Sequence, residues 1–271
     1  GPLITLGTYY VITDNLSWPA FLLGIPHGFL IMAVIWINQF PDYQADRAAN
    51  KKNLVVRLGL SKARYIYSLM MLLPFLFIIL LIYSIGLLKA LRLPFLAGSI
   101  IPLITAAAFA FHRGSFSLLP LVMALIGVGA LHLGSNCIND YHDSKGSDPI
   151  NIRLTPFSGG SRVIQENELQ PNTILALSIV FYSIGIACGL WFTFWGRPYV
   201  LLIGLSGLLA GWAYSSPPLS LMSHGLGEAL IFFAFGPLIT LGTYYVITNN
   251  LSWTAFLLGI PHGFLIMAVI W

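Results

Sequence analysis

The chain has 271 residues, of which 57% are hydrophobic and only 8% are charged, with a formal net charge of +4 at pH 7. Soluble domains carry about 25% charged residues, so this composition excludes an ordinary soluble globular protein. The positive charge comes from Lys and Arg residues in loops, which favours anchors at a cytoplasmic membrane face over contacts with nucleic acid.

Long apolar runs account for this composition, and most of them are about 16–23 residues long, as a helix that spans the hydrocarbon core requires. In chain order they are Ile66–Leu88, Leu93–Phe111, Leu118–Leu133, Ile174–Trp195, Tyr199–Tyr214, Ala229–Ile247 and Leu251–Trp271. Their apolar residues surround the whole helix, which is typical of membrane helices. A signal peptide is single and N-terminal, so this repetition argues against one. We therefore expect an all-α, polytopic transmembrane helical bundle.

The two ends of the chain are nearly identical. Residues 1–36 (GPLITLGTYYVITDNLSWPAFLLGIPHGFLIMAVIW) recur as residues 236–271, and the copies differ only at Asp14, which corresponds to Asn249, and Pro19, which corresponds to Thr254. Internal repeats of transporters are usually weak, so near-identity indicates a recent duplication, a fusion or an engineered arrangement. Because residue 271 matches residue 36, the sequence from residue 37 onward also continues the second copy.

Acidic residues are rare, yet NCINDYHDSKGSD, residues 136–148, contains three aspartates and two asparagines. Asn139 and Asp143 are four residues apart and share one face if the preceding helix continues through them. Asp140 lies one position round the helix, and Asp148 follows Gly146, which allows a turn. Hard oxygen ligands of this kind suit Mg²⁺, which takes one or two carboxylates together with water and phosphate oxygens.

A second acidic stretch, NQFPDYQAD, occupies residues 38–46. Asn38, Asp42 and Asp46 are spaced i, i+4 and i+8, so one helix face would carry a carboxamide and two carboxylates. The two stretches together could hold two or more metal ions round a diphosphate, and nearby cations could neutralise its remaining charge. Those cations are Lys51, Lys145, Arg153 and Arg162. The sequence Gly159-Gly160-Ser161-Arg162 is typical of a flexible loop that could close over the diphosphate.

Each acidic stretch taken alone could be a solvated loop whose acids balance nearby basic residues. Five of the nine acidic residues, however, fall in these two stretches. An ionisable cluster at a membrane boundary indicates a functional site, so we favour a site for metal ions and a diphosphate.

In the order of the sequence, three apolar runs lie between Asp46 and Asp140. If each run spans the membrane once, this odd number puts the two acidic stretches on opposite membrane faces. The charges favour one face, because nine of the thirteen basic residues accompany the two stretches, which predicts that both are cytoplasmic. We therefore expect a permuted or spliced order. The parent order would run from about residue 90 to 271 and then from 37 to 88, with a discontinuity near residues 89–93.

Three segments, NDYHDSKGSD, NQFPDYQADRAANKK and YSSPPLSLMSHGLGE, together resemble the intramembrane prenyltransferases of the UbiA superfamily. The segment LGTYYVIT and the Gly146 insertion are most similar to the dihydroxynaphthoate branch, which makes menaquinone or phylloquinone precursors. The resemblance implies a bundle of nine helices in the family, with a central cavity, formed by residues 1–271 as one transmembrane domain. The chain departs from the family pattern in two ways. The last two helices have no evident counterpart, and Tyr214-Ser-Ser-Pro-Pro stands where naphthoate enzymes often have Tyr-Thr-Gly-Gly-Pro.

The resemblance also implies roles for individual residues. The metal ligands would be Asn139, Asp140, Asp143 and Asp148 in the first motif, and Asn38, Asp42 and Asp46 in the second. Diphosphate binding would fall to Arg162, Lys145, Arg153, Lys51 and Asn136. Asp143, Asp42, Lys51 and Tyr214 would be catalytic. Mg²⁺ is the expected cofactor, the expected partners are a polyprenyl diphosphate, an aromatic acceptor and the lipid bilayer, and the expected location is a prokaryotic cytoplasmic membrane.

The expected reaction is Mg²⁺-dependent transfer of an isoprenyl group to 1,4-dihydroxy-2-naphthoate, with loss of the ring carboxylate. Other acceptors stay open: hydroxybenzoate, homogentisate, chlorophyllide, or an archaeal glycerol ether lipid. A different class, an ion-coupled transporter, would place carboxylates in mid-span, whereas nearly every acid here lies in a loop or at a helix end.

Two groups of other residues carry less weight. Aromatic rings such as Tyr244, Tyr245 and Trp212 could stabilise a cation, but packing explains each of them equally well. His132 lies near the end of an apolar run, where hydration at the membrane interface is the simpler explanation.

Overall fold

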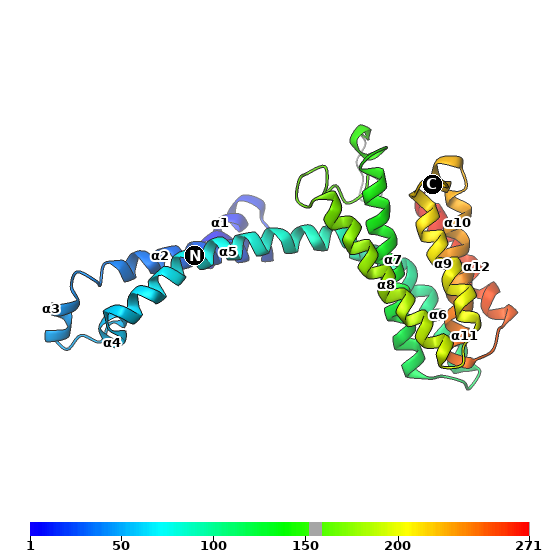
Figure 1. The fold of residues 1–271 in the computed structure, drawn as a ribbon, viewed down its shortest axis with the longest axis horizontal. Coiled ribbons are helices and arrows are strands. Elements are labelled where there is room, and N and C mark those ends of the chain that lie inside the picture. Colours follow the sequence, from blue (N-terminus) through cyan, green and yellow to red (C-terminus); the bar gives the residue numbers. More distant parts are fainter. Residues whose placement is uncertain (152–158, 271) are drawn as a thin grey trace. The chain divides into compact units, whose positions relative to one another are not determined.

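The computed structural model describes residues 1–151 and 159–270, and all regular structure in these ranges is helical. The chain divides into two compact units, Gly1–Ile85 and Gly86–Trp271 (Figure 1). The prediction of an all-α membrane bundle is thereby confirmed. The prediction of a single domain in rearranged order, with a discontinuity near residues 89–93, stays a prediction.

The first unit is formed by α1 (Pro2–Thr13), α2 (Trp18–Ile37), α3 (Tyr43–Ala48), α4 (Leu54–Leu58) and most of α5 (Leu60–Leu91). Helix α1 packs against α2 at very short range, because a Cβ atom on Gly24 would lie 2.4 Å from the Cα atom of Pro2. Asn53 begins α4, since its side-chain oxygen accepts a hydrogen bond from the amide of Val56 at 2.9 Å.

The second unit contains α6 (Ala97–His112), α7 (Leu118–Asp143), α8 (Pro171–Phe194), α9 (Tyr199–Ser215), α10 (Gly227–Phe233), α11 (Ile239–Thr248) and α12 (Trp253–Ile270). Shorter turns are η1 (Leu93–Leu96), η2 (Asp148–Ile150), η3 (Leu221–His224) and η4 (Ala234–Leu238). The π-helical turn η4 joins α10 to α11 and contains Pro237, whose missing amide proton interrupts the α-helical hydrogen-bond ladder.

Helix α7 packs most extensively against α8, and small residues make this contact possible. A Cβ atom on Gly127 would lie 3.0 Å from Cys188, and one on Gly185 would lie 2.5 Å from the Leu131 side chain. The Ser178 hydroxyl of α8 donates a hydrogen bond to the Gly134 carbonyl of α7 at 3.0 Å. Small residues and interhelical hydrogen bonds are what associate helices in lipid, where apolar surface gains nothing by leaving the solvent.

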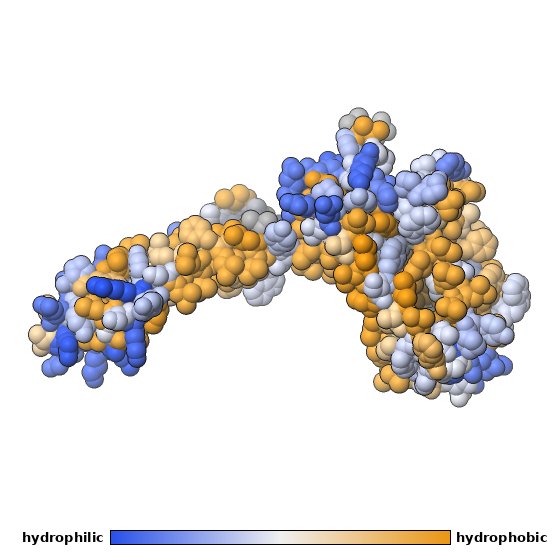
Figure 2. All heavy atoms as spheres, in the orientation of Figure 1, coloured by the Kyte–Doolittle hydropathy of each residue, from blue (hydrophilic) through white to orange (hydrophobic). Residues whose placement is uncertain are grey.

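Five helical segments are long and apolar enough to cross a membrane, counted over the residues that the structure describes. They are Trp18–Ile37, Leu60–His112, Leu118–Asp143, Pro171–Phe194 and Gly227–Thr248, and Tyr199–Ser215 and Trp253–Val269 are shorter apolar helices. Large apolar side chains such as Phe111 and Phe194 point outward. Hydrophobic residues cover the outer face of the helices in Figure 2, and hydrophilic residues gather at the loops. These features make the protein an integral, multi-pass membrane protein.

The two copies of the repeated segment fold alike but lie in different environments. Both break at the same place, where Asp14 and Asn249 end α1 and α11 in the left-handed conformation, with φ of 55° and 59°. None of the residues of α1 is buried, whereas α11 buries six of its ten, including Tyr244 and Tyr245. The local fold therefore follows the sequence, and burial follows the surrounding helices.

This difference predicts unequal effects of one substitution in the two copies. Tyr245 is 2% exposed and packs against Tyr199, with the ring centroids 5.6 Å apart, while its counterpart Tyr10 is 47% exposed. We expect Tyr245→Ala to lower the free energy of unfolding by roughly 3 kcal/mol because it leaves a cavity. Tyr10→Ala should change it by less than about 0.5 kcal/mol. Unfolding in detergent titrations would measure both, and equal effects would contradict the assigned environments.

Candidate active site

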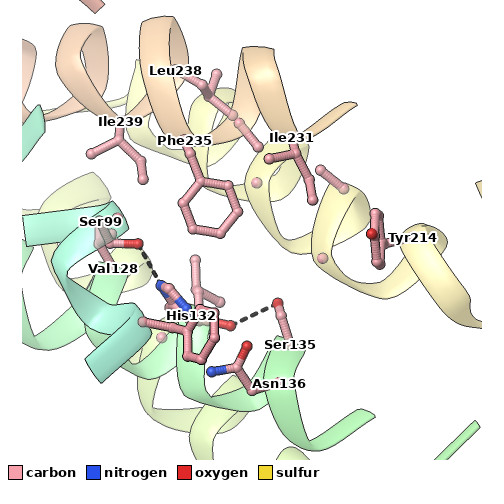
Figure 3. Close-up of a pocket in the computed structure, with 18 of the residues that line it drawn as sticks. Ser99, Val128, His132, Ser135, Asn136, Tyr214, Ile231, Phe235, Leu238 and Ile239 are labelled. Carbon is pink, nitrogen blue, oxygen red and sulfur yellow. Dashed lines mark hydrogen bonds between the residues drawn. The ribbon is translucent and has the colours of Figure 1, made fainter. Parts of the chain in front are cut away.

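A cavity of about 910 Å³ lies within the second unit. Its walls come from α6, α7, α8, α9 and the run from α10 to α12, and most of them are apolar (Figure 3). Glycines on several helices leave this space open. At Gly189 and Gly204, which line the cavity, an added Cβ atom would meet nothing within 4 Å.

One face of α7 gives the cavity a polar stripe. His132, Asn136, Asn139 and Asp143 all line the cavity, and their spacing of four, three and four residues keeps them on one side of the helix. Asp143 stands at the last residue of α7. The stripe therefore runs from the interior of the bundle to its acidic end.

The first predicted motif is gathered at that end. Asn139 donates a hydrogen bond from Nδ2 to Oδ2 of Asp143 at 2.7 Å. Asp148 also lines the cavity, and its Oδ2 accepts a hydrogen bond from Nε2 of Gln165 at 3.2 Å. Burial raises the pKa of Asp148, and the hydrogen bond from Gln165 and the charge of Arg162 oppose this shift.

Asp140 lies behind the cavity wall and is 3% exposed. Its Oδ1 accepts a hydrogen bond from the Ser161 amide at 3.2 Å and lies 3.8 Å from a guanidinium nitrogen of Arg92. Its buried Oδ2 has no hydrogen-bond partner among the described residues. A buried carboxylate oxygen without a partner is costly, so this atom retains an unused capacity to bind a cation or a donor.

Gly160 passes directly between two of these carboxylates. It has a φ of +69°, and a Cβ atom on it would lie 2.6 Å from Oδ2 of Asp148 and 3.0 Å from Oδ1 of Asp140. Only glycine accommodates both the left-handed backbone and the contact. The loop that follows is anchored by Lys89, which forms ion pairs with Glu166 and, at 2.9 Å, with Glu168.

The predicted diphosphate-binding cations have different positions. Arg162 donates a hydrogen bond from Nη1 to the Asp148 carbonyl at 3.0 Å, so it lies at the acidic end. Lys145 is turned to Tyr141: its Nζ donates to the Tyr141 hydroxyl at 2.6 Å and lies 3.8 Å from the ring centroid. It is not among the residues that line the cavity. Arg153 lies outside the described residues.

Arg92 also lines the cavity. It is not among the residues for which the sequence predicts a role. It lies beside Asp140, and its guanidinium stacks 4.7 Å from the Phe95 ring centroid. Its position just before an apolar span could have indicated a role at the membrane boundary, but residues 89–93 were interpreted only as a discontinuity of the chain. Asn136 lines the cavity as predicted and donates a hydrogen bond to the Leu91 carbonyl at 3.3 Å. Tyr214 lies at the cavity wall (Figure 3).

The second predicted motif belongs to the first unit. Asn38 follows α2 and Asp42 precedes α3, and both are exposed. Asp46 is buried, and its two carboxylate oxygens accept from Nζ of Lys51 at 2.7 Å and from Nδ2 of Asn53 at 2.8 Å. The hydrogen bond to Asp46 and its charge raise the pKa of Lys51, so Lys51 is a cation at neutral pH.

The interface explanation of His132 is wrong. His132 is 7% exposed, and its Nδ1 lies 2.7 Å from the hydroxyl of Ser99 on α6. The packing of α6 on α7 buries the ring, which the position of His132 along the chain did not indicate. Tyr244 and Tyr245 belong to the core, and neither they nor Trp212 is among the cavity-lining residues.

The donor set at the acidic end fits Mg²⁺ that is shared with a substrate. Among the described residues, no three His, Cys, Asp or Glu side chains are arranged as a complete metal site without a substrate. Asp143 and Asp148 supply carboxylates and Asn139 a carboxamide, and Mg²⁺ usually takes one or two carboxylates and completes its shell with water and phosphate oxygens. The unpartnered oxygen of Asp140 adds a further hard donor nearby.

Fold and site together define an integral membrane protein built round an apolar cavity with an acidic end. The chain belongs to the UbiA prenyltransferase family, which matches residues 1–103 and 99–271. It is 25% identical over 174 residues to 1,4-dihydroxy-2-naphthoate octaprenyltransferase of Bacillus subtilis, which covers 64% of this chain and 55% of that protein. The enzyme of the same name from Escherichia coli is 30% identical over 174 residues, 62% of this chain and 55% of that protein.

A plant relative extends the comparison. The chloroplastic 2-carboxy-1,4-naphthoquinone phytyltransferase of Arabidopsis thaliana is 28% identical over 165 residues, which is 60% of this chain and 41% of that protein. The chain thus spans about half the length of the curated relatives it matches.

The position of Gly160 predicts that even one added methyl group damages the acidic end. Gly160→Ala would strain a left-handed residue and displace two carboxylates, so we expect about a tenfold loss of affinity for pyrophosphate in the presence of Mg²⁺. Gly114→Ala is the matched control, because Gly114 has a φ of +72° and open space round its Cβ position. Calorimetric titration would measure both variants, and equal affinities would contradict the arrangement described for Gly160.

Proposed function

We propose that the protein transfers an isoprenyl group from a polyprenyl diphosphate to an aromatic acceptor, and that the acceptor is 1,4-dihydroxy-2-naphthoate. The observation that carries the proposal is the cavity of about 910 Å³, apolar over most of its wall and acidic at one end, in a chain of the UbiA prenyltransferase family. The names of the bacterial and plant relatives support the choice of a naphthoate over other acceptors.

The acidic end is suited to the diphosphate. Asn139, Asp143 and Asp148 would hold Mg²⁺ there, with Asp140 as a further donor, and Arg92 and Arg162 contribute positive charge beside them. When bound, Mg²⁺ would offset the negative charge that grows on the departing diphosphate. Fixed charges and dipoles at that position lower the barrier because they need no reorganisation during the reaction.

The apolar wall is suited to the rest of the reaction. The bond between the allylic carbon and the diphosphate oxygen breaks, and a ring carbon of the acceptor forms the new carbon–carbon bond. The ring then regains aromaticity by losing a proton or, in a ring carboxylate, CO₂. Water would capture the allylic cation, so a cavity lined by Leu, Ile, Val, Phe and Gly protects the intermediate.

We further propose that the second motif acts with the first. The spacing of Asn38, Asp42 and Asp46 and the cation Lys51 support a second group of metal and diphosphate ligands, and Tyr214 completes the catalytic set. This proposal requires the rearranged chain order, in which residues 1–271 act as one domain with both acidic stretches on the cytoplasmic side of a prokaryotic membrane. Nine of the thirteen basic residues lie in or beside the two acidic stretches, and this supports that orientation.

The first test removes one carboxylate from the acidic end. Asp143→Asn should lower Mg²⁺-dependent pyrophosphate release by about 100-fold, because a metal ligand is lost, and EDTA should abolish release by the unaltered protein. The assay uses protein in lipid vesicles with a polyprenyl diphosphate and dihydroxynaphthoate, and hydroxybenzoate and homogentisate run in parallel. The matched control is Asp14→Asn, since the second copy of the repeat carries asparagine at the equivalent position. Full activity of Asp143→Asn would refute the assignment.

The second test fills the cavity. Gly204→Leu places a side chain in open space on the cavity wall, so we expect a loss of transfer that grows with prenyl chain length. Stability should not fall, since replacing a helical glycine gains up to about 1 kcal/mol. Gly129→Leu is the control: Gly129 lies in α7, also has open space round its Cβ position, and is not a cavity-lining residue. Equal activity of the two variants would show that the cavity does not hold the prenyl chain.

A further inference from the structure

A buried polar pair interrupts the apolar wall of the cavity. His132 of α7 and Ser99 of α6 both line the cavity, and Nδ1 of His132 lies 2.7 Å from the Ser99 hydroxyl (Figure 3). The rings of His132 and Phe235 form a T-shaped contact, with the ring centroids 5.0 Å apart and the planes at 84°. Serine and phenylalanine therefore hold the imidazole in one orientation.

The immediate surroundings of this pair are largely apolar, and the neighbouring hydroxyl on α7 already has partners. Figure 3 shows Val128, Ile239 and Phe235 round the imidazole. One helical turn further on, the Ser135 hydroxyl donates to the Leu131 carbonyl at 2.8 Å and contacts the Tyr182 hydroxyl at 3.2 Å. Among the described residues, Nδ1 is the only ring atom of His132 that makes a hydrogen bond. Its Nε2 is thus left for a ligand.

His132 lies deep relative to the acidic end. It precedes Asp143 by eleven residues on the continuous helix α7, which places it about 16 Å further along the axis on the same face. A polyprenyl chain has no group that could bond to an imidazole. An aromatic acceptor has hydroxyl groups, and a polar group in an apolar cavity wall serves to orient a ligand.

We propose that His132 binds a ring hydroxyl of the aromatic acceptor, and that Ser99 is a positioning residue that fixes the imidazole for this contact. In the tautomer that this contact requires, the Nδ1–H group donates to the Ser99 hydroxyl and Nε2 accepts the hydrogen bond of the phenol. The inference rests on the proposed function for the kind of ligand. It adds the residue that selects hydroxylated rings.

The experiment compares two ligands that differ by one hydroxyl group. Binding of 4-hydroxy-2-naphthoate, whose hydroxyl is not adjacent to the carboxylate, and of 2-naphthoate to the full chain in lipid nanodiscs is measured by equilibrium dialysis, without any diphosphate. The unaltered protein should prefer the hydroxylated ligand by about tenfold, as one hydrogen bond implies. His132→Leu and Ser99→Ala should each reduce the preference to about onefold to twofold. His132→Gln, which keeps a hydrogen-bonding side chain, should retain part of it.

If His132 and Ser99 had a purely structural role, their substitution would not alter this preference, because a loosened contact between α6 and α7 would weaken the binding of both ligands equally. The matched control is His27→Leu, since His27 is exposed in the first unit and should leave the preference unchanged. Absence of a preference in the unaltered protein, or an undiminished preference in folded His132→Leu or Ser99→Ala, would overturn the inference. If His132→Leu does not fold, Ser99→Ala and His132→Gln decide the matter.

The inference and the proposed function fail in different ways. A preference that depends on His132, found in a protein that releases no pyrophosphate with any acceptor, would support the hydroxyl site and refute the transferase. Transfer to dihydroxynaphthoate with an unchanged KM in His132→Leu would support the transferase and refute the hydroxyl site.

Discussion

The close packing of α7 on α8 is the contact on which the site depends. Gly127 and Gly185 allow the two helices to pack so closely that neither position has room for a larger side chain. The Ser178 hydroxyl donates a hydrogen bond across this contact to the Gly134 carbonyl. One face of α7 is thereby fixed against α8, and another carries the polar stripe into the cavity. In lipid, where burial of apolar surface gives no net gain, such small-residue contacts determine where each helix lies.

The bilayer also explains why charge and apolar surface are separated along the cavity. Ionised groups are costly in hydrocarbon, so carboxylates are placed where a span ends. Asp143 is the last residue of α7, and Asp148 follows in the loop. Arg92 and Arg162 lie beside these acids and partly balance them. His132 and Ser99 are neutral partners for one another, which lets a polar pair lie deeper than the acids do.

The repeated segment separates local from tertiary effects within one molecule. Both copies form the same pair of helices, because the break at Asp14 or Asn249 and the capping serine, Ser17 or Ser252, are encoded locally. In the second copy α11 packs against α6, α7 and α9. In the first copy α1 has no buried residue, and α2 packs through Ala33 and Trp36 on side chains of α4 and α5. The histidine of the second copy, His262, bonds to the Gly98 carbonyl at 2.7 Å, whereas the equivalent His27 is exposed.

The sequence by itself determined the helical membrane class and the grouping of Asn139, Asp143 and Asp148, because hydropathy and i, i+4 spacing are local properties. It did not determine that Lys145 turns to Tyr141, that Arg92 reaches Asp140, or that His132 lies buried against Ser99. Each of these contacts joins groups whose distance depends on how helices pack or on the rotamer a side chain adopts. Only the tertiary structure decided them, because spacing along a chain fixes neighbours on one helix and leaves its partners open.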